Sequence, residues 1–571
     1  MRWTYTPAPP GPVRTLCREL SVTPIIAHLL FQRGLDDPAE AERFLNPMLR
    51  NLDDPFNLVH MDRAVKRLCE AMRGGEEIVV FGDYDVDGIT STVLLVSILR
   101  RFGIAPRYCV PLRLEEGYGL SSAALDRVLK DGVPNLLIAV DCGTNAAGEV
   151  ASLHERGVDT IVIDHHSGRS ELPPQCILVN PHVHGDETTA WTDLCSVGLV
   201  FKLVHALLKR LREEGEEEAF RIQLKEYLDL VAMGTIADLV PLREENRILA
   251  KAGLETLRWP RRMGLKALFE ASGMTPGEEV SPFDISFRLG PRINASGRLA
   301  DASLPVEMLL GDDWERCDSG ARMLDKFNTE RQEIERRIFL EAEEMVQSRD
   351  LDLAGYVLYD PAWHAGVVGI VASRLTRRFH RPCIVLGTEG VLAKGSGRSI
   401  TGINLVEVLK RCSHLLDHWG GHPMAVGLAL VPEQWDAFAA AFHEAVGDLV
   451  KGKMPEPELA IDAWIPEEDV GADLLDQLDR LQPFGQGNPE PVFGLRGVVL
   501  KQRPKIFGKG HFRFNLPVGG GGNVSGVAWK KSDRVPAQGA PIDLAATLSW
   551  NCWNGRKNPQ LTLADWREHE D

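Results

Sequence analysis

Short runs of apolar residues alternate with stretches of helical periodicity after residue 55. Three of these runs are predicted to be buried strands, namely Ile78–Phe81, Leu136–Val140 and Thr160–Ile163. Residues Ile89–Arg101, which follow the first run, have the pattern of a helix. Strands that alternate with helices form parallel β-α-β units, whose ligand sites lie at the carboxyl ends of the strands. The pattern therefore predicts an α/β domain with a parallel sheet.

Beyond residue 320 the composition changes three times along the chain. Residues 322–348 contain neither Gly nor Pro and are rich in Glu and Arg, so we expect one helix about 40 Å long. A smaller α/β pattern follows, with strand-like runs at Gly355–Leu358 and Cys383–Leu386. After the Pro- and Glu-rich loop Met454–Glu458, short strands, glycines and aromatic residues are typical of a small β-barrel.

The length agrees with this division, because 571 residues at roughly 150 per domain predict three or four domains. The expected fold class is α/β, with a parallel-sheet domain, a long connecting helix, a smaller α/β domain and a C-terminal β-barrel. The predicted boundaries are 1–55 for an N-terminal helical segment, 56–315 for the first α/β domain, 316–350 for the connecting helix, 351–452 for the second α/β domain and 455–571 for the barrel.

Composition and charge exclude several classes of protein. No run approaches the roughly 18 consecutive apolar residues of a membrane span, and the N-terminus lacks the pattern of a secretion signal. The ten cysteines form neither a C-x-x-C pair nor a Cys/His cluster, so we expect reduced thiols in a cytoplasmic protein. The net charge of −17 excludes a globally basic nucleic-acid coat protein, although it is compatible with a local basic groove.

Acidic side chains and two histidines cluster where the predicted strands end. They are Asp83, Asp85 and Asp87 after the first strand, Asp141 after the second, Asp164, His165 and His166 at the end of the third, and Asp238 after a later helix-like stretch. One such aspartate alone more often caps a helix or faces solvent. Together, however, they are expected to lie largely at one edge of a parallel sheet, where uncompensated carboxylates would repel one another and have raised pKa values.

A divalent metal ion relieves that repulsion. Oxygen ligands with one or two histidines suit Mn²⁺ or Mg²⁺ better than thiolate-bound zinc. Two such ions, about 3.5–4 Å apart, bind the scissile phosphate and activate water in phosphoesterases. A calcium loop is the alternative, because D-x-D-x-D-G opens an EF-hand. That loop needs a Glu where this chain has Leu94, and a helix where it has a strand.

The triplet Asp-His-His after a strand, with D-x-D-x-D-G upstream and G-T-I-A-D downstream, resembles the DHH phosphoesterase superfamily. Within it, nearly the whole chain resembles the RecJ family of single-strand-specific 5′→3′ DNA exonucleases. The motifs that carry this resemblance are Glu116–Leu120 (EGYGL), Pro291–Arg298 (PRINASGR), Trp363–Arg374 (WHAGVVGIVASR), Lys394–Ser399 (KGSGRS), Gly420–His422 (GGH) and Pro483–Pro491 (PFGQGNPEP). The resemblance implies a DHH domain, a DHHA1-type second domain and an OB-like barrel.

The resemblance also implies a role for the side chains at the strand ends. Asp141 would lie between two metal ions. His166 would lie beside the phosphate, or would contact the metal ligands without binding the metal itself. The remaining implied ligands are Asp85, Asp87, His165 and Asp238. Small phosphatases of the superfamily have a histidine where this chain has Phe81, and Asp83 is our candidate to replace it. Which of the first three aspartates holds which ion stays open.

Substrate phosphates are expected to bind to two further groups of residues. Arg292, Asn294 and Arg298 offer hydrogen-bond donors, although the arginines are also suited to tie a loop to the connecting helix. The second group is a Gly-spaced loop and a Gly-Gly-His turn, whose histidine, by resemblance, closes over the scissile phosphate opposite the metals. The residues expected there are His364, which also suits a buried structural role, Lys394, Ser396, Arg398, Gly420, Gly421 and His422. Asp141, His166 and His422 are the expected catalytic residues.

The barrel has the composition of a single-strand-binding module. Residues 499–557 contain ten Lys or Arg against two Asp, in contrast to the acidic chain as a whole. Aromatic residues interleave with these charges, and about half of them are expected to be core; they are Phe507, Phe512, Phe514, Trp529, Trp550 and Trp553. Basic residues that follow a backbone and aromatic residues that stack on bases are typical of an OB-fold.

These observations predict a metal-dependent, single-strand-specific DNA exonuclease that releases 5′-mononucleotides. The resemblance implies a role in recombination and repair, with single-stranded DNA, a single-strand-binding protein and a RecQ-type helicase as partners. One alternative is a DHH-family phosphodiesterase that acts on oligoribonucleotides or cyclic dinucleotides, although such enzymes need no barrel. The other is an inactive single-strand-binding scaffold, a class that loses the metal ligands this sequence retains.

Overall fold

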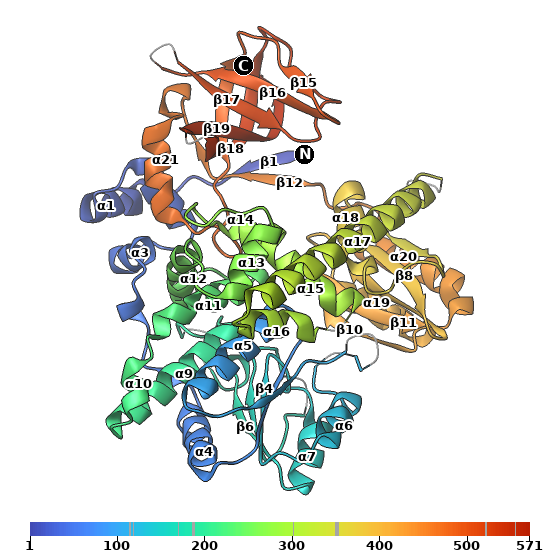
Figure 1. Ribbon diagram of the computed structural model, residues 1–571. Coiled ribbons are helices and arrows are strands. Elements are labelled where there is room, and N and C mark those ends of the chain that lie inside the picture. Colours follow the sequence, from blue (N-terminus) through green and yellow to red (C-terminus); the bar gives the residue numbers. More distant parts are fainter. Residues whose placement is uncertain are drawn as a thin grey trace.

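The computed structural model describes residues 1–112, 116–117, 119–168, 171–185, 189–300, 302–348, 353–519, 522–553 and 556–570. Figure 1 shows two α/β domains joined by one long helix, with a β-rich domain above them that lies next to the N-terminus. Tyr118 of the EGYGL motif and the predicted domain boundary at 350/351 lie outside the described residues.

Five parallel strands form the sheet of the first α/β domain, in the order β3-β2-β4-β5-β6. Their bounds are Ile78–Gly82 (β2), Arg107–Cys109 (β3), Leu136–Val140 (β4), Asp159–Ile163 (β5) and Ile177–Val179 (β6). The three strands predicted from the sequence are β2, β4 and β5, which are direct neighbours in this sheet. Their carboxyl ends therefore bring together the aspartates that follow them.

Helices cover both faces of this sheet because side chains alternate between the faces along each strand. Ile78 and Val80 pack in a cluster with α4, α5, α9 and α11, whereas Val79 and Phe81 pack with α6 and α7 on the other face. The helices of this domain are α4 (Met61–Gly74), α5 (Val86–Arg101), α6 (Ser122–Lys130), α7 (Ala147–Glu155), α8 (Pro181–His184), α9 (Ser196–Glu213), α10 (Glu217–Arg221), η3 (Leu224–Tyr227), α11 (Leu228–Ala237), α12 (Glu244–Leu257), α13 (Met263–Ala271), α14 (Pro282–Asp284), η4 (Ile285–Leu289), α15 (Gly290–Leu299) and α16 (Ser303–Leu310).

The connecting helix α17 spans Trp314–Gln347 and is 34 residues long. It begins before the Gly-free stretch that predicted it, because Asp313 caps its first turn and Gly320 packs closely against Met308 of the first domain. Its last turns supply Ile338 to the core of the second domain. No helix in the described part of the chain is long and apolar enough to cross a membrane.

The second α/β domain has a five-stranded sheet in the order β10-β11-β9-β8-β7, in which only β7 and β8 are parallel. Its elements are β7 (Tyr356–Tyr359), α18 (Val368–Phe379), β8 (Cys383–Glu389), β9 (Leu392–Arg398), α19 (Leu405–Cys412), η5 (Ser413–Leu415), β10 (His418–His422), β11 (Ala425–Leu430), η6 (Pro432–Gln434) and α20 (Trp435–Val450). The expected Gly-spaced loop at 394–398 was wrong, because these residues form β9. The expected turn at 420–422 was also wrong, because these residues end strand β10.

Seven strands form the C-terminal sheet, in the order β13-β14-β18-β19-β17-β16-β15, consistent with the expected OB-like fold. The elements of the C-terminal region, in which β12 lies outside this sheet, are β12 (Glu458–Ile461), β13 (Ala463–Trp464), η7 (Glu467–Asp469), α21 (Ala472–Leu478), η8 (Asp479–Leu481), β14 (Phe493–Val499), β15 (Lys505–Phe507), β16 (His511–Pro517), β17 (Asn523–Ala528), β18 (Pro541–Trp553) and β19 (Arg556–Glu568).

The N-terminal segment packs against this C-terminal sheet. It contains β1 (Arg2–Tyr5), α1 (Pro10–Leu20), α2 (Pro24–Gln32), α3 (Pro38–Leu45), η1 (Leu49–Asn51) and η2 (Pro55–Asn57). Strand β1 pairs with β12 in parallel, so the segment is not wholly helical as the sequence suggested. Apolar residues of α1–α3 and of the barrel belong to one buried cluster. The two ends of the chain therefore share a hydrophobic core.

Candidate metal centre and active site

The D-x-D-x-D-G segment forms a strand, a tight turn and a helix, and not a calcium loop. Asp85 caps helix α5, since its Oδ1 accepts hydrogen bonds from the backbone N–H of Asp87 (2.9 Å) and of Gly88 (3.1 Å). The turn folds so tightly that a Cβ on Gly88 would lie 2.4 Å from the carbonyl oxygen of Asp83. Glycine is required there, and the turn holds all three aspartates beside the sheet edge.

Helix α9 supplies two backbone donors to Asp87. The buried carboxylate accepts from the N–H of Ser196 (2.7 Å) and of Val197 (2.8 Å), where the helix dipole favours negative charge. The hydroxyl of Ser196 donates to Oδ1 of Asp141 at 2.9 Å. Ser196 was absent from the sequence prediction, although a serine directly before a long apolar run is a signal of a helix start.

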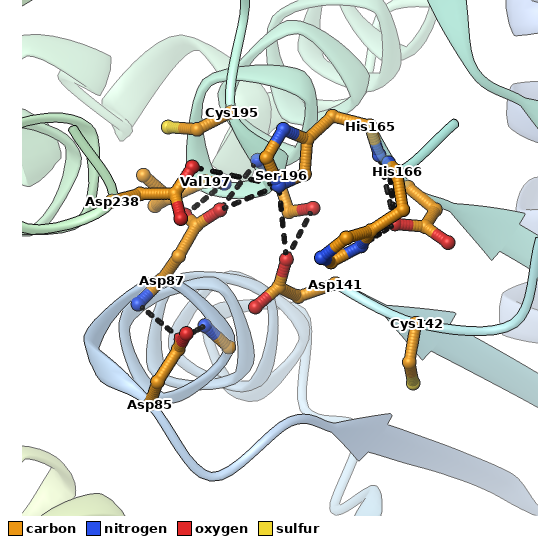
Figure 2. Close-up of polar contacts among 12 residues, drawn as sticks. Asp85, Asp87, Asp141, Cys142, His165, His166, Cys195, Ser196, Val197 and Asp238 are labelled. Carbon is orange, nitrogen blue, oxygen red and sulfur yellow. Dashed lines mark hydrogen bonds and ion pairs between the residues drawn. The ribbon is translucent and has the colours of Figure 1, made fainter. Parts of the chain in front are cut away.

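His165 points its Nε2 atom into a group of carboxylates (Figure 2). This atom lies 3.5 Å from Oδ1 of Asp141, 3.5 Å from Oδ2 of Asp238 and 3.9 Å from Oδ2 of Asp87. It is buried and has no hydrogen-bond partner among the described residues. An unpaired imidazole nitrogen surrounded by oxygens fits a divalent ion that needs mixed oxygen and nitrogen ligands.

The predicted ligands fall into three overlapping groups whose ligand atoms lie within 4.8 Å of one another. The groups are Asp87, His165 and Asp238; Asp83, Asp85 and Asp141; and Asp141, His165 and His166. Asp141 and His165 each occur in two of them, and Asp141 is the one that connects the Asp83–Asp85 pair to the histidines. This arrangement supports its predicted place between two ions, which stays a prediction. Asp238, expected after a helix, is the C-cap residue of α11.

The electrostatics of the centre favour a bound cation. Burial raises the pKa of the carboxyls, and the negative charge of their neighbours raises it further. The pKa of Asp87 rises to about 7, that of Asp238 rises to about 9, and that of Asp141 lies well above its usual range. Burial lowers the pKa of His165 to about 4, so its imidazole is neutral at pH 7 and has a lone pair to donate.

Asp164 positions both histidines of the triplet and is not a member of any of the three ligand groups. Its Oδ1 accepts from the backbone N–H of His165 (2.8 Å) and from Nδ1 of His166 (2.7 Å). Burial opposes ionisation of Asp164, but the hydrogen bond and charge of His166 hold its pKa below the usual range. Burial likewise opposes protonation of His166, yet the bond to Asp164 raises its pKa to about 9. His166 is therefore a cation beside the centre at pH 7.

Helix α15 carries the PRINASGR residues, and its two predicted arginines join the first domain to other elements. Nη2 of Arg292 lies 2.9 Å from Asp325 of the connecting helix, which is the structural role considered for this arginine. Arg298 donates to the carbonyl of Gly366 in the second domain at 2.8 Å. Oδ1 of Asn294 is buried without a hydrogen-bond partner among the described residues. Their contact with phosphate stays a prediction.

Several predicted residues of the second domain converge at the start of helix α18. A Cβ on Gly369, in its first turn, would lie 3.1 Å from Oγ of Ser396 and 3.5 Å from Nη2 of Arg398. His364, just before this helix, accepts from the N–H of Gly366 at 3.1 Å. Because a helix N-terminus attracts anions, this cluster is suited to a phosphate group.

The remaining predicted residues of this domain have other neighbours. Lys394 lies 3.4 Å from a carboxylate oxygen of Glu389. Gly421, the neighbour of Gly420, has φ +142, and a Cβ on it would lie 2.4 Å from the carbonyl oxygen of Ala425. The adjacent strand alone therefore requires this glycine. His422 is exposed at the end of β10.

The barrel aromatics divide into core and surface residues. Phe512 and Phe514 are buried, and Trp550 packs against the core and donates to Asp479. Trp529 is half exposed, and the centroid of its ring lies 5.0 Å from that of His511. These two rings and Phe507 form one cluster, with the guanidinium of Arg513 over the Phe507 ring. The side chain of Trp553 lies outside the described residues.

Comparisons with known families give the same three units. The DHH family, N-terminal domain, matches residues 77–235; the DHHA1 domain matches residues 353–448; and the RecJ OB domain matches residues 461–565. The fold and the aspartate–histidine centre thus define a protein of the DHH class with an added OB domain.

Similar proteins of known name identify the family within this class. The chain is 37% identical to the single-stranded-DNA-specific exonuclease RecJ of Bacillus subtilis, over 99% of this chain and 70% of that protein. It is 36% identical to RecJ of Escherichia coli, over 95% of each chain. The crystal structure of Thermus thermophilus RecJ in complex with Mn²⁺ superposes with a TM-score of 0.84 at 32% identity, covering 100% of this chain and 80% of that one. The chain belongs to the RecJ family.

Proposed function

We propose that this protein is a metal-dependent exonuclease that degrades single-stranded DNA in the 5′→3′ direction and releases 5′-mononucleotides. The observation that carries the proposal is the unpaired Nε2 of His165 among the carboxylates of Asp87, Asp141 and Asp238. The relatives that share this fold are named single-stranded-DNA-specific exonucleases, and two Thermus thermophilus structures contain Mn²⁺ or Mg²⁺.

The residues of the centre would have different roles in phosphodiester hydrolysis. Asp83, Asp85, Asp87, Asp141, His165 and Asp238 would hold two Mn²⁺ or Mg²⁺ ions. Bound ions of this kind supply positive charge for the scissile phosphate and lower the pKa of a water molecule. Asp164 orients His165, and it also keeps His166 protonated, which places a positive donor beside the phosphate.

The second domain holds the substrate on the opposite side. We assign phosphate binding to the α18 N-terminus with Ser396 and Arg398, and to Arg298 of the first domain, which already contacts Gly366. His422 is assigned to charge stabilisation or proton transfer at the scissile phosphate. Because both α/β domains would contribute, we expect the groove between them to admit a single strand and to exclude a duplex, which is wider. The OB-like domain retains the strand between cleavage events.

The experiment uses single-stranded oligonucleotides labelled at the 5′ or the 3′ end and incubated with Mn²⁺. We expect the 5′ label to be released at once as a mononucleotide, while the 3′ label shortens stepwise, and we expect blunt duplexes to persist. Immediate release of the 3′ label would contradict the polarity. Cleavage of RNA or cyclic dinucleotides in preference to DNA would favour the alternative DHH phosphodiesterase, and full retention of every strand would favour an inactive scaffold.

The cellular setting is part of the proposal. We infer a cytoplasmic enzyme of recombination and repair that acts with single-strand-binding protein and a RecQ-type helicase. All ten cysteines are thiols and not disulfides, which supports a reducing compartment. Calorimetric titration of the full chain with each purified partner tests these protein contacts. If no heat of binding is measured at micromolar concentrations, that protein is not a partner.

A further inference from the structure

Ser196 hydrogen-bonds to two of the candidate metal ligands through two different groups (Figure 2). Its backbone N–H donates to Oδ2 of Asp87 at 2.7 Å, and its hydroxyl donates to Oδ1 of Asp141 at 2.9 Å. Asp87 and Asp141 belong to different groups of candidate ligands. A single residue of the polypeptide therefore connects two parts of the candidate metal centre.

The hydroxyl of Ser196 does not cap the helix to which it belongs. Helix α9 begins at Ser196, so the capping position is that of Cys195, which makes no side-chain capping hydrogen bond. A serine that caps a helix stands one position earlier and accepts a hydrogen bond from the backbone of the first turn. Ser196 is fully buried, and its hydroxyl donates to Asp141 instead. The hydroxyl therefore serves the metal centre and not the start of the helix.

The carboxylate of Asp141 has little else to fix its direction. The torsion that turns an aspartate carboxylate is broad and roughly twofold, so steric contacts alone do not select one orientation. In the described part of the chain, the hydroxyl of Ser196 donates the one hydrogen bond that this carboxylate accepts. Both oxygens of Asp87, by contrast, accept from backbone N–H groups, which the helix holds rigidly. The orientation of Asp141 therefore depends on one side chain.

We propose that Ser196 is a positioning residue, whose hydroxyl fixes the plane of the Asp141 carboxylate and thereby raises the affinity of the centre for divalent ions. This inference rests on the proposed function. An ionised carboxylate offers about four lone-pair directions on its two oxygens, and the hydroxyl takes one of them on Oδ1. The other directions stay available to metal ions in a fixed orientation. Residues that hydrogen-bond to metal ligands typically contribute about 10–100-fold to metal affinity.

The first test measures metal binding without DNA and without cleavage. Calorimetric titrations of the full-length protein with Mn²⁺ and with Mg²⁺ compare wild type with Ser196→Ala. We expect the variant to bind both ions about 10–100-fold more weakly. Affinity for Ca²⁺, whose coordination is flexible, is expected to fall less than affinity for Mg²⁺, which demands near-ideal octahedral geometry. Single-strand affinity in EDTA is expected to stay unchanged, because the buried hydroxyl contacts Asp141 and not the strand.

The second test determines whether the hydroxyl acts through Asp141. In the Asp141→Asn background, Ser196→Ala is expected to weaken Mn²⁺ binding by about threefold or less, because the ligand that the hydroxyl orients is already impaired. The matched control is Ser91→Ala. Ser91 is also fully buried, lies on α5, which packs against α9, and has a hydroxyl without a hydrogen-bond partner in the described part of the chain. The Mn²⁺ affinity of this control is expected to equal that of wild type.

Equal Mn²⁺ affinity in wild type and Ser196→Ala would overturn the proposal, and so would equal losses for Mg²⁺ and Ca²⁺. The melting temperature in EDTA is measured alongside, because loss of a buried hydrogen bond lowers stability. A general loosening of the fold weakens Mn²⁺ binding equally in the wild-type and Asp141→Asn backgrounds, and that result would also overturn the positioning role. Failure of the proposed function is a different outcome, in which wild-type protein binds Mn²⁺ but leaves single strands uncleaved.

Discussion

Replacement of Asp141 by asparagine separates chemistry from folding more cleanly than any other change at the metal centre. The residue has φ +64, a left-handed conformation that asparagine adopts readily and that alanine does not. An asparagine Oδ1 still accepts the hydrogen bond from Ser196. The substitution therefore removes one negative charge and one shared ligand while the backbone and the neighbouring helix stay in place.

Two opposite effects on stability follow from this single change. Without metal, the variant is at least as stable as wild type, because the neutral amide is no longer repelled by Asp87, Asp85, Asp83 and Asp238. With metal, wild type gains about 2.7 kcal/mol when the ion is present at 100 times its dissociation constant. If the lost ligand weakens binding about 100-fold, the same relation leaves the variant a gain of only about 0.4 kcal/mol.

The assay combines thermal unfolding with single-turnover cleavage. We expect Mn²⁺ to raise the melting temperature of wild type by several degrees and that of Asp141→Asn by much less, with an exposed aspartate variant, Asp131→Asn, behaving as wild type. Loss of a residue that hydrogen-bonds to a metal ligand typically costs 10–100-fold in activity, and we expect the single-turnover cleavage rate of Asp141→Asn to fall by more than that. Single-strand binding in EDTA is expected to be largely unchanged. Cleavage within tenfold of wild type, or an undiminished response to Mn²⁺, would refute the assignment of Asp141 as a shared ligand.

Three further predictions concern the second domain, the barrel and the junction between the ends of the chain. His422→Ala keeps its metal content by elemental analysis but cleaves about 10²-fold more slowly in a single turnover; an unchanged rate would leave this histidine without a role in the reaction. Trp529→Ala is expected to weaken single-strand affinity with little change in melting temperature, because this side chain is half exposed. Phe512→Ala, a change of a buried residue, is expected to lower the free energy of unfolding by about 3–5 kcal/mol. The reverse pattern would mean that the surface cluster is structural. Arg247→Ala removes a buried guanidinium that donates to the carbonyls of Phe44 and Gln482, so calorimetry should show a loss of about 3 kcal/mol or more, and a loss below about 1 kcal/mol would contradict this role.

The first α/β domain and the convergence of its candidate metal ligands were predictable because their signals are local. The runs that became β2, β4 and β5 are apolar on both faces, as buried parallel strands must be, and each is followed by an aspartate at its carboxyl end. Parallel strands place those ends at one edge of a sheet. The convergence of Asp85, Asp141 and His165 therefore follows from the order of elements along the chain.

Contacts between distant segments determined the features that the sequence did not predict. Glycines at 395 and 421 suggested loops near a phosphate, but the backbones of neighbouring strands are the atoms that exclude a side chain there. The N-terminal helices look like a separate unit until their apolar faces are seen to share a core with residues more than 400 positions later. Ser196 became part of the centre because α9 begins beside Asp87. Periodicity along a chain reports which face of an element is buried, but only the folded structure selects the partner that covers it.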